Sequence, residues 1–403
     1  MTRRQARSRT PRGRSRVGER FEVEVGPVAH GGHCVARLPE RESRVVFVRH
    51  ALPGERVVVE VTEGTDGDRF WRGDAVEVLE ASADRVEAPC PYAGPGLCGG
   101  CDFQHVAVPA QRDLKTAVVR EQLVRLGRLD ADSALVRETQ VEAVPVPGRP
   151  DDGLRWRTRQ RYAALPDGMP AMRAHRSHRL VPVDDCLIAA DGARPADADG
   201  LLVDEGTSQV AAHDVLVGDT SHAFSVATDG FWQVHPEAPR VLVSTVMELL
   251  DPQPGERALD LYSGVGLFAR FVGAATGARV VAVEADRDAC RHARANLAGL
   301  ERAAVECGPV DRVLRHGYDE PFDLVVLDPP REGAKRAVVE QVVDRRPRAV
   351  AYVACDPAAL GRDVAIFAEH GYELTAIRAF DLFPMTHHVE CVALLTRTGP
   401  GQA

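Results

Sequence analysis

The sequence of 403 residues contains no apolar run of the length that a membrane-spanning helix needs, about 20 residues. It also lacks an apolar segment behind its arginine-rich start, so the pattern of a secretory signal peptide is missing. We therefore expect a cytoplasmic protein with no membrane partner. The apolar fraction of 44% is enough for buried cores, and the chain length predicts two or three domains.

Disulfides are not expected either, because the nine cysteines are an odd set and the cytoplasm is reducing. Three of them, Cys90, Cys98 and Cys101, stand close together in CPYAGPGLCGGC. Two glycines permit a tight turn there, and Cys186 can supply a fourth thiolate. Ligation by four thiolates suits zinc or an iron–sulfur cluster, and the spacing does not choose between them.

Acidic residues are missing from residues 1–16, which hold seven arginines in a chain of net charge −9. We expect a disordered basic tail that contacts phosphate nonspecifically or only keeps the protein soluble. A second basic stretch, RWRTRQRY, alternates arginine with other residues. Read as a strand, it places four guanidinium groups on one face that can follow an RNA backbone, with a solvated charged face as the alternative. These arginines are Arg155, Arg157, Arg159 and Arg161.

Residues 17–85 read as short strands interrupted by glycine and proline. Their alternation and even spacing predict a small five-stranded barrel like the OB fold. An amphipathic helix is expected at 109–128. We assign 86–235 to a central domain of mixed α+β type that carries the cysteine cluster, and helix 109–128 can pack on the domain that follows.

Strands and helices alternate from residue 236 to 403. This order predicts an α/β domain with a doubly wound, Rossmann-like parallel sheet, closed by a hairpin whose last strand runs antiparallel. The expected helices cover 236–250, 265–275, 286–298, 335–344 and 357–369.

A nucleoside cofactor is predicted by LDLYSGVGLFAR, in which Asp260 ends a strand and Gly264 and Gly266 precede a helix. Glu284 ends the next strand, where a carboxylate suits two ribose hydroxyls. The third glycine of a dinucleotide site and the lysine of a phosphate loop are both missing, which disfavours NAD and ATP. The pattern resembles the first motif of class I S-adenosylmethionine methyltransferases.

Three further residues are expected at the carboxyl edge of this sheet. Asp328 ends the fourth strand in LDPPR, where Arg331 replaces the aromatic residue of amino-methylating enzymes. Cys355 ends the fifth strand at the start of a helix, whose N-terminus should lower the pKa of the thiol. Glu390 begins the antiparallel strand, and apolar neighbours should raise its pKa.

A thiolate and a carboxylate beside a methyl donor suit methylation of a pyrimidine at C5. Carbon C5 is a weak nucleophile until a thiolate adds at C6, and the C5 proton must then be removed by a base. For each residue alone, a buried core cysteine and a strand glutamate paired with an arginine are the alternatives.

The motifs DLYSGVG, DPPREG, ACDPAALGRDV and HHVECVALL, preceded by FWQVHPEA, resemble those of the RNA (uracil-5-)-methyltransferase family. The resemblance covers nearly the whole chain. It implies that Cys355 is the nucleophile and Glu390 the base. It further implies cofactor contacts at Gln233, Tyr262, Glu284 and Asp328.

Two positions depart from the family pattern. His235 stands where the family often has asparagine, and Leu267 replaces an asparagine that contacts the cofactor in some members. A cofactor contact at Leu267 is therefore in doubt. A flipped-out target base could be held by Phe231, Trp232 or Tyr262.

The barrel resembles the TRAM domain, an RNA-binding fold of the same family, most clearly in ALPGERVVVEV. Ribosomal-RNA members of the family carry a [4Fe-4S] cluster on a similar cysteine set, which favours this cluster over zinc. Together these features predict a 23S rRNA uridine methyltransferase with no obligate protein partner. The alternatives are a tRNA uracil-5-methyltransferase, an amino-methyltransferase and a non-catalytic iron–sulfur RNA-binding protein.

Overall fold

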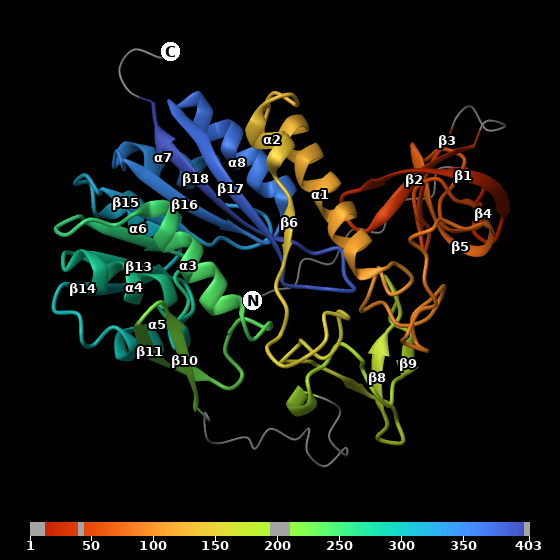
Figure 1. The fold of residues 1–403 in the computed structure, drawn as a ribbon, viewed down its shortest axis with the longest axis horizontal. Coiled ribbons are helices and arrows are strands. Elements are labelled where there is room, and N and C mark those ends of the chain that lie inside the picture. The colour runs from red at the N-terminus through yellow and green to blue at the C-terminus, as the bar shows by residue number, and fades with distance from the viewer. Residues whose placement is uncertain (1–12, 39–43, 194–209, 399–403) are drawn as a thin grey trace. The chain divides into compact units, whose positions relative to one another are not determined.

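The computed structural model describes residues 13–38, 44–193 and 210–398 (Figure 1). Their contacts divide the chain into two compact units. The first holds the described residues up to Gln111 together with Tyr162–Cys186 and Met385–His387, and the second holds the others. The expected central domain at 86–235 is therefore shared between the two units, because its segments associate with the barrel or with the large sheet.

The first unit contains a closed five-stranded barrel, as predicted. Its strands follow the order β1-β2-β3-β5-β4 around the barrel. Alternate side chains point inward, and Val46, Val48 and Trp71 are at most 2% exposed. Such β-branched and aromatic residues suit a pleated surface that is buried on one side. The strands are β1 Arg20–Ala29, β2 His33–Leu38, β3 Arg44–Arg49, β4 Arg56–Glu63 and β5 Phe70–Glu80, and a separate sheet holds β7 Ala163–Ala164, β8 Pro170–Arg173 and β9 Leu180–Pro182.

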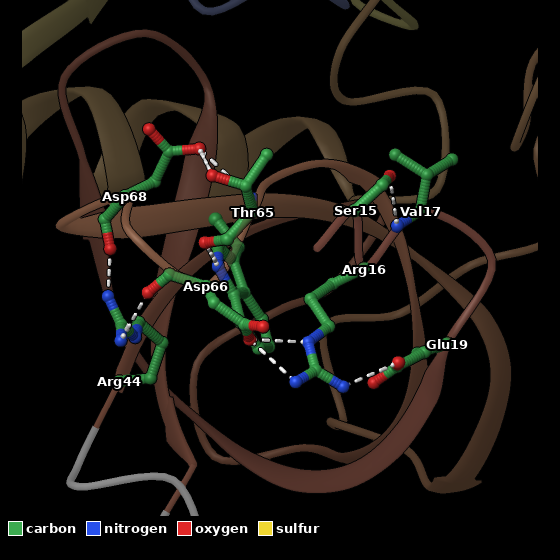
Figure 2. A network of polar contacts seen from close by, with 9 residues as sticks. Ser15, Arg16, Val17, Glu19, Arg44, Thr65, Asp66 and Asp68 are labelled. Atoms are coloured by element: carbon green, nitrogen blue, oxygen red, sulfur yellow. Dashed lines mark hydrogen bonds and ion pairs between the residues drawn. The ribbon is translucent and has the colours of Figure 1, made fainter. Parts of the chain in front are cut away.

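The end of the predicted basic tail is ordered on the barrel. Ser15 forms a bridge with Thr65, and Arg16 donates from Nε to Asp66 Oδ1 at 2.6 Å and from Nη1 to Glu19 Oε1 at 2.8 Å. Figure 2 shows the Arg16 guanidinium between these two carboxylates. The basic tail was predicted to extend to residue 16, but Arg16 is held on the barrel by the carboxylates of Asp66 and Glu19. Residues 1–12 of the tail lie outside the described part of the chain.

The second unit contains an eight-stranded sheet. Its first five strands are parallel, and β18 runs antiparallel to both neighbours, which confirms the predicted topology. A short strand, β6, adds an unpredicted parallel edge beside β17. The order is β14 Ala303–Cys307, β13 Val280–Glu284, β12 Ala258–Leu261, β15 Leu324–Leu327, β16 Ala349–Ala354, β18 Glu390–Arg397, β17 Tyr372–Asp381 and β6 Val141–Ala143.

Two apolar layers cover the two faces of this sheet. Leu259 and Leu261 of β12 belong to one layer, and Ala258 belongs to the other, as alternation along a doubly covered strand requires. Helix α1 contributes Val119 and Leu123 to the first layer. Helix α6 was not predicted. The helices are α1 Val108–Arg125, α2 Ala134–Glu138, α3 Ala238–Leu250, α4 Leu267–Thr276, α5 Arg287–Asn296, α6 Val310–His316, α7 Lys335–Asp344 and α8 Pro357–Glu369.

A hairpin of β10 (Val210–Val217) and β11 (Thr220–Ala227) also belongs to the second unit. Asn296 of α5 fixes it, because its side chain accepts from Ser225 N at 2.8 Å and donates to Ser225 O at 3.1 Å. Across the described ranges, no helix has the length and apolar character that crossing a bilayer demands.

Candidate active site

The carboxyl edge of the parallel strands brings together the predicted catalytic and cofactor residues of the second unit. Asp260 lies on β12, Glu284 ends β13, Asp328 follows β15 and Cys355 follows β16. The antiparallel register pairs Ala354 with Cys391, and Glu390 therefore lies beside Cys355. Side chains from five strands thus meet at one edge, as such sheets place their ligands.

The loop between β12 and α4 has the backbone conformation that its glycines allow. Gly264 and Gly266 have φ values of +54° and +85°. Tyr262 also has a positive φ of +65°, which costs a non-glycine residue roughly 1–2 kcal/mol. Hydrogen bonds hold this strained loop, because Gly264 N donates to Glu284 Oε2 at 2.9 Å and Tyr262 N donates to Val283 O at 2.9 Å.

Asp260 offers an unused acceptor beneath this loop. One carboxylate oxygen, Oδ2, accepts from Ala269 N at 2.8 Å, whereas the buried Oδ1 has no hydrogen-bond partner. The buried hydroxyl of Ser263 is also unpartnered. Buried polar groups normally have partners. These two atoms therefore fit a polar ligand bound against the loop.

The edge carries an unusual density of acidic groups. Burial raises the pKa of Asp260 and of Asp328 to about 7, and nearby Glu284 adds to both shifts. Burial and Asp328 raise the pKa of Glu390 well above its usual value, and Arg331 opposes this shift. The expected direction for Glu390 is thus found. A site with these groups favours a ligand that carries positive charge.

The thiol of Cys355 behaves differently from the prediction. Burial, followed by the negative charges of Glu390 and Asp328, raises its pKa to about 12. The predicted lowering by helix α8 is therefore wrong. Its N-terminus is already capped, because Asp356 Oδ1 accepts from Ala359 N at 2.8 Å. The thiol of the free protein is consequently protonated at neutral pH.

Two groups of this edge were missed by sequence reasoning. Asp363 of α8 is buried and accepts from Ala334 N at 2.7 Å and from the Tyr352 hydroxyl at 2.6 Å, which fixes the loop after Asp328. Arg331 in this loop lies 3.2 Å from His388 through Nη2 and Nε2. The charge of Arg331 next to the DPP motif was a usable signal, whereas nothing in the local pattern marks Asp363.

The four arginines of RWRTRQRY do not form one face of a strand. Arg155 has a φ of +56°, which breaks the alternation, and Trp156 is only 1% exposed. Arg159 donates through its guanidinium to Gly230 O and, at 2.7 Å, to Asp229 O. Thr158 binds Val234 O through N at 2.8 Å. This segment therefore buttresses residues 229–235, and the predicted strand that would align the four guanidinium groups on one face is not formed.

The buttressed segment carries Gln233, a predicted cofactor residue, and two of the candidate base-holding aromatics. Phe231 is 69% exposed, whereas Trp232 stacks on His213 with centroids 4.7 Å apart. His235 is buried, and its Nδ1 accepts from Glu237 N at 3.2 Å. Leu267 is buried in the apolar layer under α4, which agrees with the doubt about a cofactor contact there.

The four clustered cysteines all belong to the first unit. Burial raises the pKa of Cys90, Cys98 and Cys101, and the neighbouring cysteines, including Cys186, add to each shift. The four thiols are therefore close together, and all are free of disulfides. However, among the described residues no three His, Cys, Asp or Glu side chains are placed to hold a metal ion.

Models of three protein families match the chain. The TRAM domain matches residues 14–76, which cover most of the barrel. The model described as tRNA (Uracil-5-)-methyltransferase matches residues 316–398, and the methyltransferase small domain matches 237–352. Between them, the last two matches contain Asp260 on β12 together with Asp328 and Cys355, which follow β15 and β16.

Relatives match over nearly the full length. An RNA methyltransferase of Streptomyces avermitilis, named as uncharacterized, is 45% identical over 96% of this chain and 100% of its own. The 23S rRNA (uracil(1939)-C(5))-methyltransferase of a Shewanella species is 30% identical over 90% of this chain and 93% of its own. The fold is also that of the Pyrococcus abyssi tRNA (uracil-54, C5)-methyltransferase bound to S-adenosyl-L-homocysteine, with a TM-score of 0.62 at 21% identity, over 91% of this chain and 99% of that one.

Proposed function

Because this chain belongs to the RNA (uracil-5-)-methyltransferase family, we propose that it methylates C5 of a specific uridine in 23S ribosomal RNA. It is an S-adenosylmethionine-dependent RNA uracil-5-methyltransferase with a TRAM barrel. The name of the 30% identical relative supports ribosomal RNA as the substrate. Transfer RNA is the alternative, and a cytoplasmic location is expected for either substrate.

The register that sets Glu390 beside Cys355 carries this proposal, because it supplies the two groups that C5 methylation needs. The Cys355 thiol first releases its proton to water, the thiolate sulfur then bonds to C6 of the uracil, and the electron pair of the C5–C6 double bond moves toward O4 as an enolate. Arg331 is the nearby cation that can stabilise this negative charge. After C5 has gained a methyl group, Glu390 removes the C5 proton, and the sulfur leaves as the double bond re-forms.

S-adenosylmethionine, when bound, supplies the methyl group on a positively charged sulfonium. The residues present fit it: Glu284 suits the ribose, and the free oxygen of Asp260 offers an acceptor. Gly264 and Gly266 allow close approach of the backbone, and the acidic edge suits the charge. Gln233, Tyr262 and Asp328 would complete the contacts.

The substrate is tested by incubating the purified enzyme with labelled S-adenosylmethionine and either 23S rRNA or total tRNA, both made without modification. We expect 5-methyluridine at a single position of 23S rRNA, located by digestion and mass spectrometry. Methylation of tRNA alone would support the alternative substrate. Activity that survives loss of the thiol, on an exocyclic amine, would instead indicate an amino-methyltransferase.

Binding of S-adenosylmethionine should strengthen as the pH rises through about 7. Because the pKa values of Asp260 and Asp328 are raised to about 7, the free enzyme holds protons there that a cationic ligand expels. Affinity should increase by up to about tenfold per pH unit below pH 7 for each proton released. Calorimetry in two buffers of different ionisation enthalpy measures this proton release.

S-adenosylhomocysteine is the matched control, because its sulfur is uncharged. An equal pH dependence for both ligands would contradict the electrostatic explanation.

The raised pKa values of Asp260 and Asp328 also affect the stability of the free protein. Since the folded state holds these protons more tightly than the unfolded chain, the free energy of unfolding of the free protein should fall as the pH rises from about 4 to about 7.

Substitution of Arg159 by alanine should reduce kcat/KM, because the guanidinium holds the main chain just before Phe231 and Gln233. Loss of hydrogen bonds from a charged group predicts a reduction of roughly tenfold to a hundredfold. Arg161→Ala is the matched control, since Arg161 is an exposed neighbour outside this buttress, and it should stay near wild type. Equal losses of RNA affinity in both variants would instead support a phosphate-binding row.

We also propose a [4Fe-4S] cluster on Cys90, Cys98, Cys101 and Cys186. Four mutually close thiols supply the donor set, and a four-iron cluster separates its thiolates more widely than a single ion does. Enzyme purified without oxygen should contain four iron and four acid-labile sulfide per chain. Cys98→Ser should lose both, whereas Cys307→Ser, a control at an exposed cysteine, should retain them. Stoichiometric zinc without sulfide would contradict the proposal.

A further inference from the structure

Two cysteines flank Glu284 at the carboxyl end of β13. Strand β14 lies beside β13 at one end of the strand order, and the register places Cys307 directly opposite Glu284 (Figure 1). Cys290 lies in the first turn of α5, the helix that follows β13, and its Sγ donates to Glu284 O at 3.3 Å. The proposed methyl transfer uses neither thiol, and both lie next to the residue assigned to the cofactor ribose.

The two thiols also contact each other. Burial raises the pKa of Cys290 to about 12, and a hydrogen bond with the thiol of Cys307 adds to this shift. Helix α5 is fixed in this position, because Arg294 Nη2 donates to Val305 O of β14 at 3.1 Å. Both cysteines are free in this structure. Two thiols in hydrogen-bond contact are near enough for a disulfide to form between them.

The two cysteines differ in their access to solvent. Cys307 is exposed at the end of β14, whereas Cys290 is fully buried. A small oxidant therefore reaches Cys307 first. A buried neighbour such as Cys290 is then placed to react with the product, as the resolving cysteine does in a redox-sensitive pair. The pair thus has one thiol for each of the two steps of disulfide formation.

Glu284 depends on contacts that such a disulfide would change. Its main-chain oxygen accepts from Gly308 N at 2.8 Å and from the Cys290 thiol at 3.3 Å. Its carboxylate accepts from Gly264 N at 2.9 Å and from Asp286 N at 2.7 Å. A disulfide removes the hydrogen that Cys290 donates and ties α5 to β14 on either side of Glu284. The carboxylate would then shift from the place where it meets the ribose hydroxyls.

We propose that Cys307 and Cys290 form a reversible disulfide that weakens the binding of S-adenosylmethionine at Glu284. This inference rests on the proposed role of Glu284 as the ribose contact. The oxidant is a low-molecular-weight disulfide. The Cys307 thiol loses its proton to water, and its sulfur attacks the small disulfide, which releases one small thiolate and leaves a mixed disulfide on Cys307.

The second step closes the bridge. The Cys290 thiol loses its proton to water, its sulfur attacks the sulfur of Cys307, and the second small thiolate leaves. Each small thiolate takes up a proton, so two protein thiols and one small disulfide become one protein disulfide and two small thiols. Because burial keeps Cys290 protonated, closure should take minutes to hours. An excess of small thiol reverses both steps.

The test incubates the full-length enzyme without oxygen in reduced and oxidised glutathione at different ratios. After acid quenching and alkylation of free thiols, trypsin separates the two cysteines into peptides 288–291 and 303–312. Mass spectrometry should find these peptides joined in proportion to the oxidised fraction. Calorimetry should show S-adenosylmethionine affinity reduced by roughly fivefold to tenfold, about the effect of one neutral hydrogen bond. Excess reduced glutathione should restore it.

Cys307→Ser is the main control, because the position is exposed and the variant keeps the cysteines of the proposed cluster. It should form no bridge and bind the cofactor equally under both conditions. Cys290→Ser keeps a hydroxyl donor for Glu284 O and should stop at the mixed disulfide of Cys307 with glutathione.

Three results would overturn the proposal. They are the absence of joined peptides at the highest oxidised ratio, a bridge that leaves the affinity unchanged, and an equal loss of affinity in Cys307→Ser. A reduced enzyme that does not bind S-adenosylmethionine would contradict the proposed function itself. That failure is distinguishable, because the peptides report the bridge without any cofactor.

Discussion

Replacing Cys355 by alanine is expected to abolish the transfer of labelled methyl groups to RNA, with a loss on the order of 10⁴-fold or more. The reason is chemical, because without a sulfur bonded to C6 the uracil C5 remains too weak a nucleophile to accept a methyl group. Cys355→Ser should fail as well, since an alkoxide is harder to form than a thiolate, and burial together with the acidic surroundings already raises the pKa of the thiol to about 12. Incorporation of label into 23S rRNA measures the effect.

The loss must come from chemistry and not from unfolding. Binding of S-adenosylmethionine should therefore persist in Cys355→Ala, which would show that the variant is folded. Cys307→Ala is the matched control, because Cys307 is an exposed cysteine at the end of β14 in the same sheet. Its activity should stay close to that of the wild type. Undiminished activity of the Cys355 variants would refute the covalent mechanism.

Replacing Glu390 by glutamine should trap the enzyme on its RNA. Addition of Cys355 and methylation of C5 need no base at position 390, but removal of the C5 proton does. The methylated adduct should accumulate and appear as a protein–RNA band that survives denaturing electrophoresis. Turnover should fall by roughly 10²- to 10⁴-fold, the usual contribution of a general base.

Two comparisons make this result specific. Glu373→Gln, at an exposed position of the neighbouring strand β17, should turn over normally and give no band. The double change of Glu390→Gln with Cys355→Ala should also give no band, because the bond to C6 cannot form. A trapped band that lacks the extra methyl group would show that Glu390 acts before methyl transfer. Normal turnover of Glu390→Gln would show that Glu390 is not the base.

The protonation states of Cys355 and Glu390 set a condition on the reaction. In the free enzyme the thiol of Cys355 is protonated, and burial also favours the protonated form of Glu390. Both groups must lose a proton before they can act in their proposed roles. Arg331 already lowers both pKa values, and a cationic cofactor near these carboxylates would lower them further by offsetting the negative charge of Asp328. Binding of the cofactor is thus expected to precede attack on the base.

The location of the site could be predicted because the sheet has a simple pattern. Strands such as LVVL and AVAYVA are buried on both faces, and the polar residue that follows each strand must lie at the carboxyl edge. Asp328 and Cys355 were found in this way. The place of Glu390 required only the further step that its strand is antiparallel.

The remaining errors arose where local pattern and tertiary contacts disagree. RWRTRQRY alternates like a strand, but burial of Trp156 and the positive φ of Arg155 turn the segment into a support for another loop. The pKa of Cys355 depends on carboxylates from other strands, and a helix start alone does not reveal them. Asp363 acts through bonds to Tyr352 and to Ala334, which the local sequence does not mark.

The short strand β6 has a consequence for how this protein is made. Its three residues pair with Ala379, Phe380 and Asp381 at the outer edge of the sheet, and Glu142 binds Arg378 at 2.7 Å. During synthesis β6 emerges more than 200 residues before its partner strand β17. The pairing of these two strands cannot form until translation is almost complete. A fragment that begins after β6 would leave the edge of β17 bare, and an uncovered edge of this kind recruits other chains and aggregates.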